Sequence, residues 1–246
     1  MNCEGDGMWL CGIDEAGRGP VLGPLVIAMC SIPDGDAHML EEQDVDDSKK
    51  LSFARRNELV EWFNQQKEKR KWRSHVILCS PEEIDCAVYD QELNLLEAKK
   101  FAEAIDGGLL EEPTVIFADA CDTNTSRFTQ RIIQHSTLWN KELYALTSEH
   151  KADQNHRIVS MASILAKYHR DTAMLELQQE MDVEIGSGYP SDPKTKMALK
   201  GLVKPPQPHE SLRWSWKTVE TYWNEHYSTP LPMRKSYNST QQTTLF

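Results

Sequence analysis

Four acidic residues stand where apolar segments of this chain end or begin. Asp14 and Glu15 follow one apolar run, and Asp119 ends a second. Asp153 comes just before a long helical pattern. Buried carboxylates cost free energy unless a cation or a hydrogen-bond network offsets the cost, and oxygen ligands suit magnesium or manganese better than zinc. The four acids therefore indicate a phosphodiester-hydrolysing centre with two ions about 3.5–4 Å apart, one activating water and one stabilising the leaving oxygen.

Each acid also has a purely structural interpretation. Asp153 could cap the following helix, Asp119 could begin a turn, and the adjacent pair could be a solvated strand end. The pair raises a geometric question, because consecutive strand residues point to opposite faces. Either the strand already turns at Glu15, so that both side chains reach the metal ion, or the Glu15 backbone carbonyl is the group that binds the ion. Both possibilities stay open from the sequence.

A glycine-arginine-glycine turn follows the adjacent acids. Gly17 and Gly19 allow the main chain to approach a ligand closely, and Arg18 can hold an anion. Since a protein distinguishes RNA from DNA by the 2′-hydroxyl, these main-chain groups are suited to contact that hydroxyl and its phosphate. A plain hairpin turn is the alternative, but it does not explain the arginine. The missing Gly-Lys-Ser/Thr ending excludes a nucleotide-binding P-loop.

Other candidate contacts to nucleic acid are spread along the chain. The glycine-rich stretch 186–193 carries one aromatic residue, Tyr189, which could instead anchor its loop on the core. Exposed lysines and arginines are usually only solvated, so the remaining candidates rest on their proximity to the motifs. They are Ser48, Lys49, Lys50, Ser163, Lys167, Arg170, Lys194 and Lys217.

The hydrophobic pattern predicts the elements that must position these residues. Strands are expected at about residues 8–14, 22–31, 74–78, 114–118 and 143–147. Helices are expected at about residues 52–68, from 80 onward behind a capping box, and at 92–105, 125–135, 156–181, from 192 onward and 215–227. Early hairpin-like strands followed by strand-helix alternation predict an α/β fold with a mixed sheet and helices packed on it.

The composition limits the possible classes of protein. With 39% hydrophobic residues the chain can bury a core, and its six cysteines have no paired spacing for structural zinc or disulfides. We see no leader peptide and no run long enough to span a membrane, so a cytoplasmic protein is expected. The net charge of −11 argues against nucleic acid, unless the acids gather around cations and basic residues lie beside the motifs.

Seven stretches resemble, in order, the motifs of ribonuclease HII, the type 2 ribonuclease H of archaea and bacteria. The residues in these stretches are most similar to those of archaeal members. They cover roughly residues 8–220. The stretches are Gly12 to Pro24, Asp47 to Leu51, Phe117 to Ala120, His150 to Asp153, Ser160 to Lys167 with Arg170-Asp171, Gly186 to Pro193, and Ser215 to Thr218.

This resemblance implies a fold and an activity. The fold is the ribonuclease H fold, a five-stranded mixed sheet flanked by helices, with a C-terminal helical extension. The activity is cleavage of the RNA strand of RNA–DNA hybrids and cleavage 5′ of single ribonucleotides in duplex DNA, which leaves 3′-hydroxyl and 5′-phosphate ends for repair or primer removal. Asp14, Glu15, Asp119 and Asp153 match the catalytic, metal-binding positions, and Tyr189 matches a tyrosine that senses the RNA–DNA junction. The family contains monomers, and we expect one here.

The resemblance also suggests how the chain is divided. We expect a catalytic domain at 1–200, a helical extension at 201–228 and a flexible tail at 229–246. The tail ends in a peptide similar to those that grip the sliding clamp, with Gln242, Leu245 and Phe246 as the contacts. Its single aromatic residue follows Leu245 directly, whereas the usual pattern places aromatics further on. An inert end is the alternative.

Two other functions stay open from the sequence. One is a metal-dependent nuclease of the same fold that acts on DNA alone, which would cut without a 2′-hydroxyl. The other is a non-catalytic protein that binds hybrids, which would show binding without metal-dependent turnover.

Overall fold

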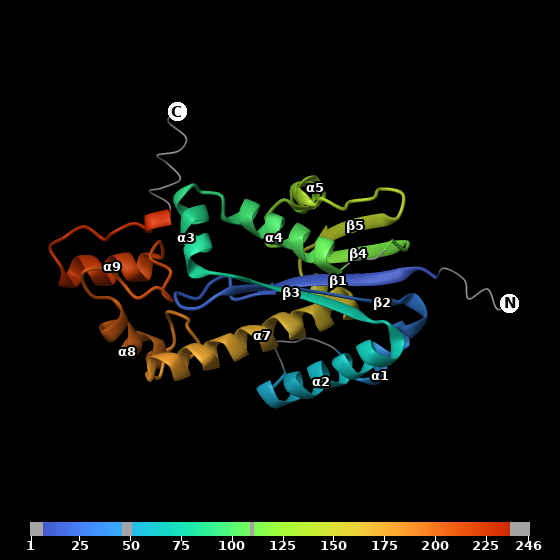
Figure 1. Ribbon diagram of the computed structural model, residues 1–246, viewed down its shortest axis with the longest axis horizontal. Coiled ribbons are helices and arrows are strands. Elements are labelled where there is room, and N and C mark those ends of the chain that lie inside the picture. The colour runs from blue at the N-terminus through green and yellow to red at the C-terminus, as the bar shows by residue number, and fades with distance from the viewer. Residues whose placement is uncertain (1–6, 46–50, 109–110, 237–246) are drawn as a thin grey trace. The chain divides into compact units, whose positions relative to one another are not determined.

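The computed structural model describes residues 7–45, 51–108 and 111–236. Within them, one sheet has five strands in the order β3-β2-β1-β4-β5 (Figure 1). The strands are β1 (Trp9–Ala16), β2 (Leu25–Pro33), β3 (Arg73–Cys79), β4 (Thr114–Asp119) and β5 (Tyr144–Glu149). β1 pairs antiparallel with β2 and parallel with β4, and β4 pairs parallel with β5. The predicted mixed sheet is confirmed.

Helices alternate with these strands as expected. They are α1 (Ala37–Glu42), α2 (Phe53–Arg70), α3 (Pro81–Tyr89), α4 (Leu93–Gly108), α5 (Thr125–His135), α6 (Ala152–Asn155), α7 (Arg157–Met181), α8 (Pro193–Leu202) and α9 (Lys217–His226). The capping box that opens α3 is present, with Ser80 and Glu83 bonded reciprocally. The sequence missed α1 and α6, because helices of six residues or fewer are too short to show a helical period.

The chain forms two compact units. The first unit comprises Met1–Ala16, Val26–Ile77 and Glu97–His169, and the second comprises Gly17–Leu25, Leu78–Leu96 and Arg170–Phe246. In the described residues, no helix has both the length and the apolar composition that crossing a membrane requires.

The core of the first unit lies on both sides of its strands. All residues of β2 except the last are buried, as expected for a strand covered on both faces. One cluster joins β2 to α1, α2 and the first part of α7. Figure 1 shows α4 and α5 on the opposite side of the sheet, where Phe101 and Phe128 meet at a ring-centroid distance of 5.1 Å.

The second unit has its own apolar core. Residues of α8 and α9 pack with Val21, Leu22 and Leu212, and Leu22 forms an isolated bridge with Leu212. The predicted start of the second strand at residue 22 is therefore wrong, because β2 begins only at Leu25. Part of the expected tail is also anchored here, since Arg234 is 5% exposed and pairs with the buried Asp85 at 2.8 Å.

Gly12 allows α7 to lie directly against β1 in the first unit. A Cβ atom at this position would lie 2.6 Å from the backbone nitrogen of Val159 and would also clash with the carbonyl of Ile158. Only glycine allows this approach, and it fixes the spacing between α7 and the strand that carries Asp14.

Substituting Gly12→Ala should therefore lower the free energy of unfolding by about 1–3 kcal/mol, because backbone atoms of α7 must move to admit the methyl group. Thermal unfolding would measure the loss. Gly35→Ala is the matched control, since no atom lies within 4 Å of the position its Cβ would take. Equal melting temperatures for the two variants would contradict the close approach.

Candidate active site

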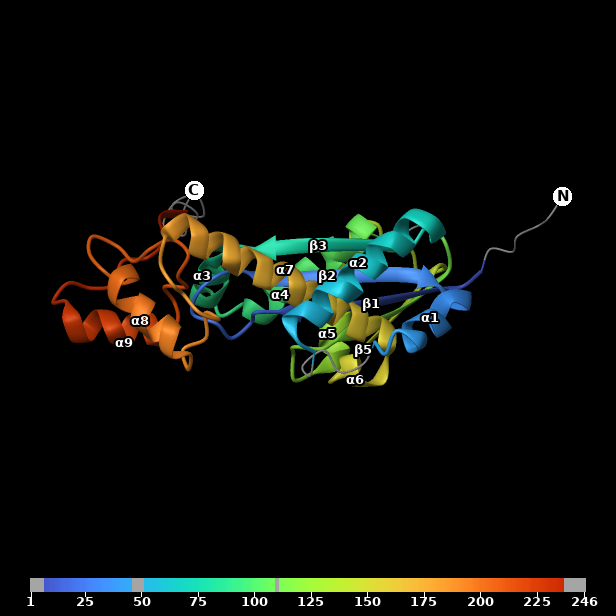
Figure 2. The same cartoon turned by 90° about the horizontal axis from the view of Figure 1, so that it is seen from below.

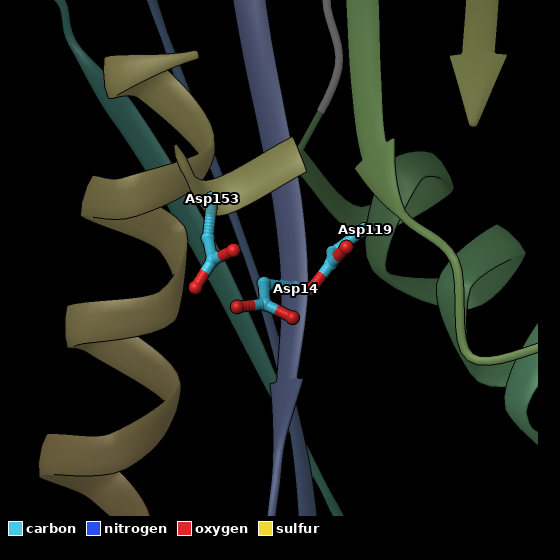
Figure 3. Close-up of side chains that lie close together, drawn as sticks. All are labelled: Asp14, Asp119 and Asp153. Carbon is cyan, nitrogen blue, oxygen red and sulfur yellow. The ribbon is translucent and has the colours of Figure 1, made fainter. Parts of the chain in front are cut away.

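Asp14, Asp119 and Asp153 converge in the first unit (Figure 3). The parallel register that pairs Ile13 with Ala118 brings Asp14, two residues before the end of β1, beside Asp119, the last residue of β4. Each of the three residues offers a carboxylate oxygen within 4.8 Å of the other two. Asp14 and Asp153 are only 4% and 2% exposed, so three acidic groups share a small and largely buried space.

Asp153 reaches this space through α6, which follows β5 (Figure 2). Lys151 turns the chain with a left-handed φ of 60°, and the next residue, Ala152, donates its N–H to Asp119 Oδ1 at 3.0 Å. Ser160 of α7 donates its hydroxyl to the Asp153 carbonyl. The interpretation of Asp153 as a helix cap is wrong: it lies inside α6, whose capping position is Lys151.

Asp14 shows the electrostatic consequence of this convergence. Burial, followed by the nearby Asp119 carboxylate, raises the Asp14 pKa to about 7. A hydrogen bond from Ser163 and the charge of Lys167 lower the pKa but do not cancel this effect. Lys167 in turn donates to Ser163 Oγ at 2.7 Å. The three carboxylates thus form an excess of negative charge, which Ser163 and Lys167 offset only in part.

Glu15 lies in regular strand rather than in a turn. β1 continues to Ala16, and Glu15 pairs with Ile27 of β2, so the suggestion that the strand turns at Glu15 is wrong. The Glu15 backbone N–H donates to Asp14 Oδ1 at 2.7 Å. Burial, then Asp14 and Glu97, raise the Glu15 pKa well above its usual range. Glu15 Oε2 is buried and has no hydrogen-bond partner among the described residues.

Glu97 is an acid near the site that sequence reasoning missed. It lies in α4 with a fully buried side chain, and its negative charge helps to raise the pKa of the Glu15 carboxyl. A signal was present, since Glu97 lies four residues before Phe101 on the apolar stripe of the predicted helix. A glutamate on a buried stripe usually has a specific partner.

A divalent cation fits the donor set of the three aspartates. All the ligand atoms are carboxylate oxygens, which magnesium and manganese prefer. A bound cation would also stabilise the ionised form of Asp14, which burial and Asp119 disfavour. Glu15 lies outside this group of three, and its side chain or its carbonyl remains a candidate fourth ligand.

The glycine-arginine-glycine turn belongs to the second unit. Gly17 has a φ of +89°, and a Cβ there would lie 2.8 Å from the Pro24 carbonyl and clash with Arg170, so the turn requires glycine. Gly19 is exposed. The guanidinium of Arg18, expected to hold an anion, donates to Asn94 Oδ1 at 2.6 Å.

Tyr189 and Arg170 lie beside this turn. The Tyr189 ring is 3.6 Å from the position that a Cβ of Gly19 would take, and Tyr189 is 43% exposed, available to a ligand. The Arg170 guanidinium stands 5.6 Å from the centre of this ring and donates to the Ser187 carbonyl at 3.0 Å. Arg170 is only 5% exposed, which suits support of the turn and loop better than an exposed phosphate contact.

The other predicted contact residues fall in three places. Ser163 and Lys167 lie against Asp14 in the first unit. Lys194 and Lys217 are exposed in the second unit and form ion pairs with Glu184 and Glu220 at 2.5 and 3.1 Å. The remaining candidates lie outside the described residues: Ser48, Lys49, Lys50, Gln242, Leu245 and Phe246.

A mixed five-stranded sheet in this strand order, with carboxylates near the ends of neighbouring parallel strands, defines a ribonuclease H-like protein. The model of the ribonuclease HII family matches residues 11–219. A ribonuclease HII from Methanococcus maripaludis is 38% identical over 229 residues, which cover 90% of each chain.

Solved structures agree with this result. The ribonuclease H2 of Pyrococcus horikoshii OT3 is 34% identical and matches with a TM-score of 0.77, over 90% of this chain and 100% of that one. The ribonuclease HII in a complex with PCNA from Archaeoglobus fulgidus is 32% identical, with a TM-score of 0.71 over 85% and 95%. The chain belongs to the ribonuclease HII family. It is therefore an endoribonuclease that acts on RNA–DNA hybrids, and the resemblance to archaeal members is confirmed.

Removing one of the clustered charges should stabilise the protein when no metal is present. With chelator at pH 8, Asp14→Asn should raise the free energy of unfolding by on the order of 4 kcal/mol, since folding raises the Asp14 pKa from 3.8 to about 7 and each pKa unit corresponds to about 1.4 kcal/mol. Added Mg²⁺ or Mn²⁺ should raise the melting temperature of the wild type more than that of the variant. A variant less stable than the wild type in chelator would contradict the repulsion.

Asp122→Asn is the matched control, with the opposite expected sign. Asp122 is buried and bonded by Arg127 at 2.5 Å, which together with Arg131 lowers its pKa to about 2. An acid with a lowered pKa stabilises the fold above its unfolded pKa of about 4 and loses that contribution as pH falls towards 2. Asp122→Asn should therefore destabilise the protein at neutral pH and do so less as pH falls from about 4 to 2.

Proposed function

We propose that this endoribonuclease cuts 5′ of single ribonucleotides in duplex DNA as well as within RNA–DNA hybrids, and leaves 3′-hydroxyl and 5′-phosphate ends. The observation that carries the proposal is the convergence of Asp14, Asp119 and Asp153. Several carboxylates meeting within a few ångströms form the kind of site in which two metal ions catalyse phosphodiester hydrolysis. We assign Mg²⁺ or Mn²⁺ to it because all the donors are oxygens.

The residues of the first unit have distinct tasks in this proposal. The three aspartates would hold the ions, which would supply activation of the attacking water and stabilisation of the leaving oxygen. Ser163 orients the Asp14 carboxylate through its hydrogen bond, and Lys167 fixes Ser163. Glu15 serves as the fourth acid, since its carboxyl is buried beside Asp14, whose charge raises its pKa. No large movement is needed to bring these groups together, which favours catalysis.

Recognition of the ribonucleotide is assigned to the second unit. Backbone groups of Gly17, Arg18 and Gly19 contact the 2′-hydroxyl and its phosphate, and Tyr189 stacks at the junction with DNA. Only Glu15 and Ala16 separate Asp14 from Gly17 in the chain. The remaining contacts to the nucleic-acid backbone are assigned to Ser48, Lys49, Lys50, Ser163, Lys167, Lys194 and Lys217, whereas the buried Arg170 supports the turn and its loop.

A role in ribonucleotide excision repair and replication completes the proposal, carried out by a monomer in the cytoplasm. The relative from Archaeoglobus fulgidus was solved in a complex with PCNA, and we assign clamp binding in this chain to Gln242, Leu245 and Phe246. We assign the catalytic domain to residues 1–200, the helical extension to 201–228 and a tail that ends in the clamp-binding peptide to 229–246, with Arg234 anchoring the start of this tail.

A labelled DNA duplex with one ribonucleotide tests the reaction. Wild type with Mg²⁺ should give a single cut 5′ of the ribonucleotide. Chelator or Asp119→Asn should abolish it, because an asparagine side chain at this position can still accept the hydrogen bond of Ala152 but cannot supply the charge. Asp122→Asn is the control that should keep cutting. Equal cutting of an all-DNA duplex would indicate a DNA-specific nuclease, and binding without cutting a non-catalytic protein.

A pull-down with the sliding clamp tests the tail. Deleting residues 242–246 should abolish retention on the clamp and leave cleavage of a short duplex unchanged, because these residues lie far in sequence from the acids. Retention that survives the deletion would remove the assignment.

A further inference from the structure

The carbonyl groups of the glycine-arginine-glycine turn (Gly17 to Gly19) accept hydrogen bonds from side chains of one segment far along the chain. Arg213 donates to the carbonyls of Gly17 at 2.5 Å, Arg18 at 2.8 Å and Gly23 at 3.1 Å. All of these residues belong to the second unit. A guanidinium carries five donors in a rigid fork, so one buried side chain can fix three peptide groups at once.

The next carbonyl of the turn is held in the same way. Trp216 Nε1 donates to the carbonyl of Gly19 at 3.1 Å. In a planar trans peptide the N–H points opposite to the C=O of the same peptide group. The N–H groups of Arg18 and Gly19 therefore point away from Arg213, while the following peptide has no N–H because residue 20 is proline. The turn thus presents two N–H groups on the side opposite to the arginine.

Arg213 also places positive charge beneath the turn. Its side chain is fully buried, and its guanidinium donates to main-chain carbonyls, while the charge of Asp85 acts on it without cancelling the effect of burial. The neighbouring Arg170 adds a second guanidinium, and burial together with this like charge lowers the Arg213 pKa to about 10. Two buried cations close together cost free energy, and an anion bound on the turn would offset that cost.

The segment that carries Arg213 is itself rigidly held. Asp85 is fully buried and accepts the N–H groups of Trp214 and Ser215, each at 2.9 Å. It also accepts the Ser215 hydroxyl at 2.6 Å and the Arg234 guanidinium at 2.8 Å. The orientation of Arg213 is therefore set before any ligand arrives.

We propose that Arg213 is a positioning residue for ribonucleotide recognition. It orients the Gly17–Gly19 peptides so that their N–H groups meet the 2′-hydroxyl and its phosphate, and Trp216 completes the arrangement. This inference rests on the proposed function of the turn and adds the residue that sets its specificity. Arg213 acts through the turn and needs no contact of its own with the substrate.

Arg213→Lys tests the inference because lysine keeps the positive charge but lacks the planar guanidinium that donates to several carbonyls at once. The readout is the preference for a ribonucleotide, measured as the inhibition constant of an all-DNA duplex divided by the KM for the same duplex with one ribonucleotide. Arg213→Lys should lower this ratio by about 10- to 100-fold through a higher KM, as expected for lost charge-assisted hydrogen bonds. Trp216→Phe loses one neutral hydrogen bond and should lower it about 3-fold.

Trp223→Phe is the matched control. Trp223 is a buried tryptophan of the same unit whose Nε1 donates to the carbonyl of Thr229 at 2.7 Å instead of the turn. A purely structural defect lowers the melting temperature and the apparent kcat but leaves the preference unchanged, and this is expected for Trp223→Phe. If Arg213→Lys does not fold, Trp216→Phe decides the question.

The outcomes separate the inference from the proposed function beneath it. A wild type with no preference for the ribonucleotide would remove the recognition role of the turn, and the inference would fall with it. A wild type with a strong preference that Arg213→Lys and Trp216→Phe both retain would overturn the role of Arg213 alone.

Discussion

Mutual repulsion of buried carboxylates is the constraint around which the first unit is built. The register of β1 and β4 sets Asp14 beside Asp119, and the Ala152 N–H bonded to Asp119 positions α6, which carries Asp153. The glycine at position 12 lets α7, with Ser163 and Lys167, approach the same strand. A fold selected for stability alone would separate these charges. Holding them together costs free energy, as expected where a site is organised for a cation.

The balance of buried charge differs between the two units. The first unit buries Asp14, Glu97, Asp122 and Asp153, whereas the second buries Arg170, Arg213 and Arg234 together with Asp85. The net charge of −11 is thus a poor guide to nucleic-acid binding here. What matters is where charge lies: acids where cations can neutralise them, and guanidiniums beneath a turn that offers N–H groups to an anion.

The sequence predicted the sheet and correctly placed Asp119 at a strand end, because an apolar run followed by an acid is a local pattern, but it ended the first strand at Asp14, two residues too early. It failed where position depends on distant contacts. Asp153 lies in a helix too short to show a period, and the course of β1 through Glu15 depends on pairing with β2. The role of Arg213 could not be predicted from the sequence, since nothing near a lone arginine indicates that it will be buried against carbonyl groups nearly 200 residues earlier in the chain.

The similarity of residues 215–218 to the family motif takes on a physical meaning from these contacts. Ser215 bonds the buried Asp85, and Trp216 bonds the Gly19 carbonyl. Lys217 is the exposed member of the motif and pairs with the neighbouring Glu220. A motif beside a nucleic-acid site is easily interpreted as a set of direct contacts. Here Trp216 acts on the main chain of the turn and Ser215 helps hold the segment that carries Arg213, so the sequence signature reflects the shape of the recognition surface more than the groups that touch the substrate.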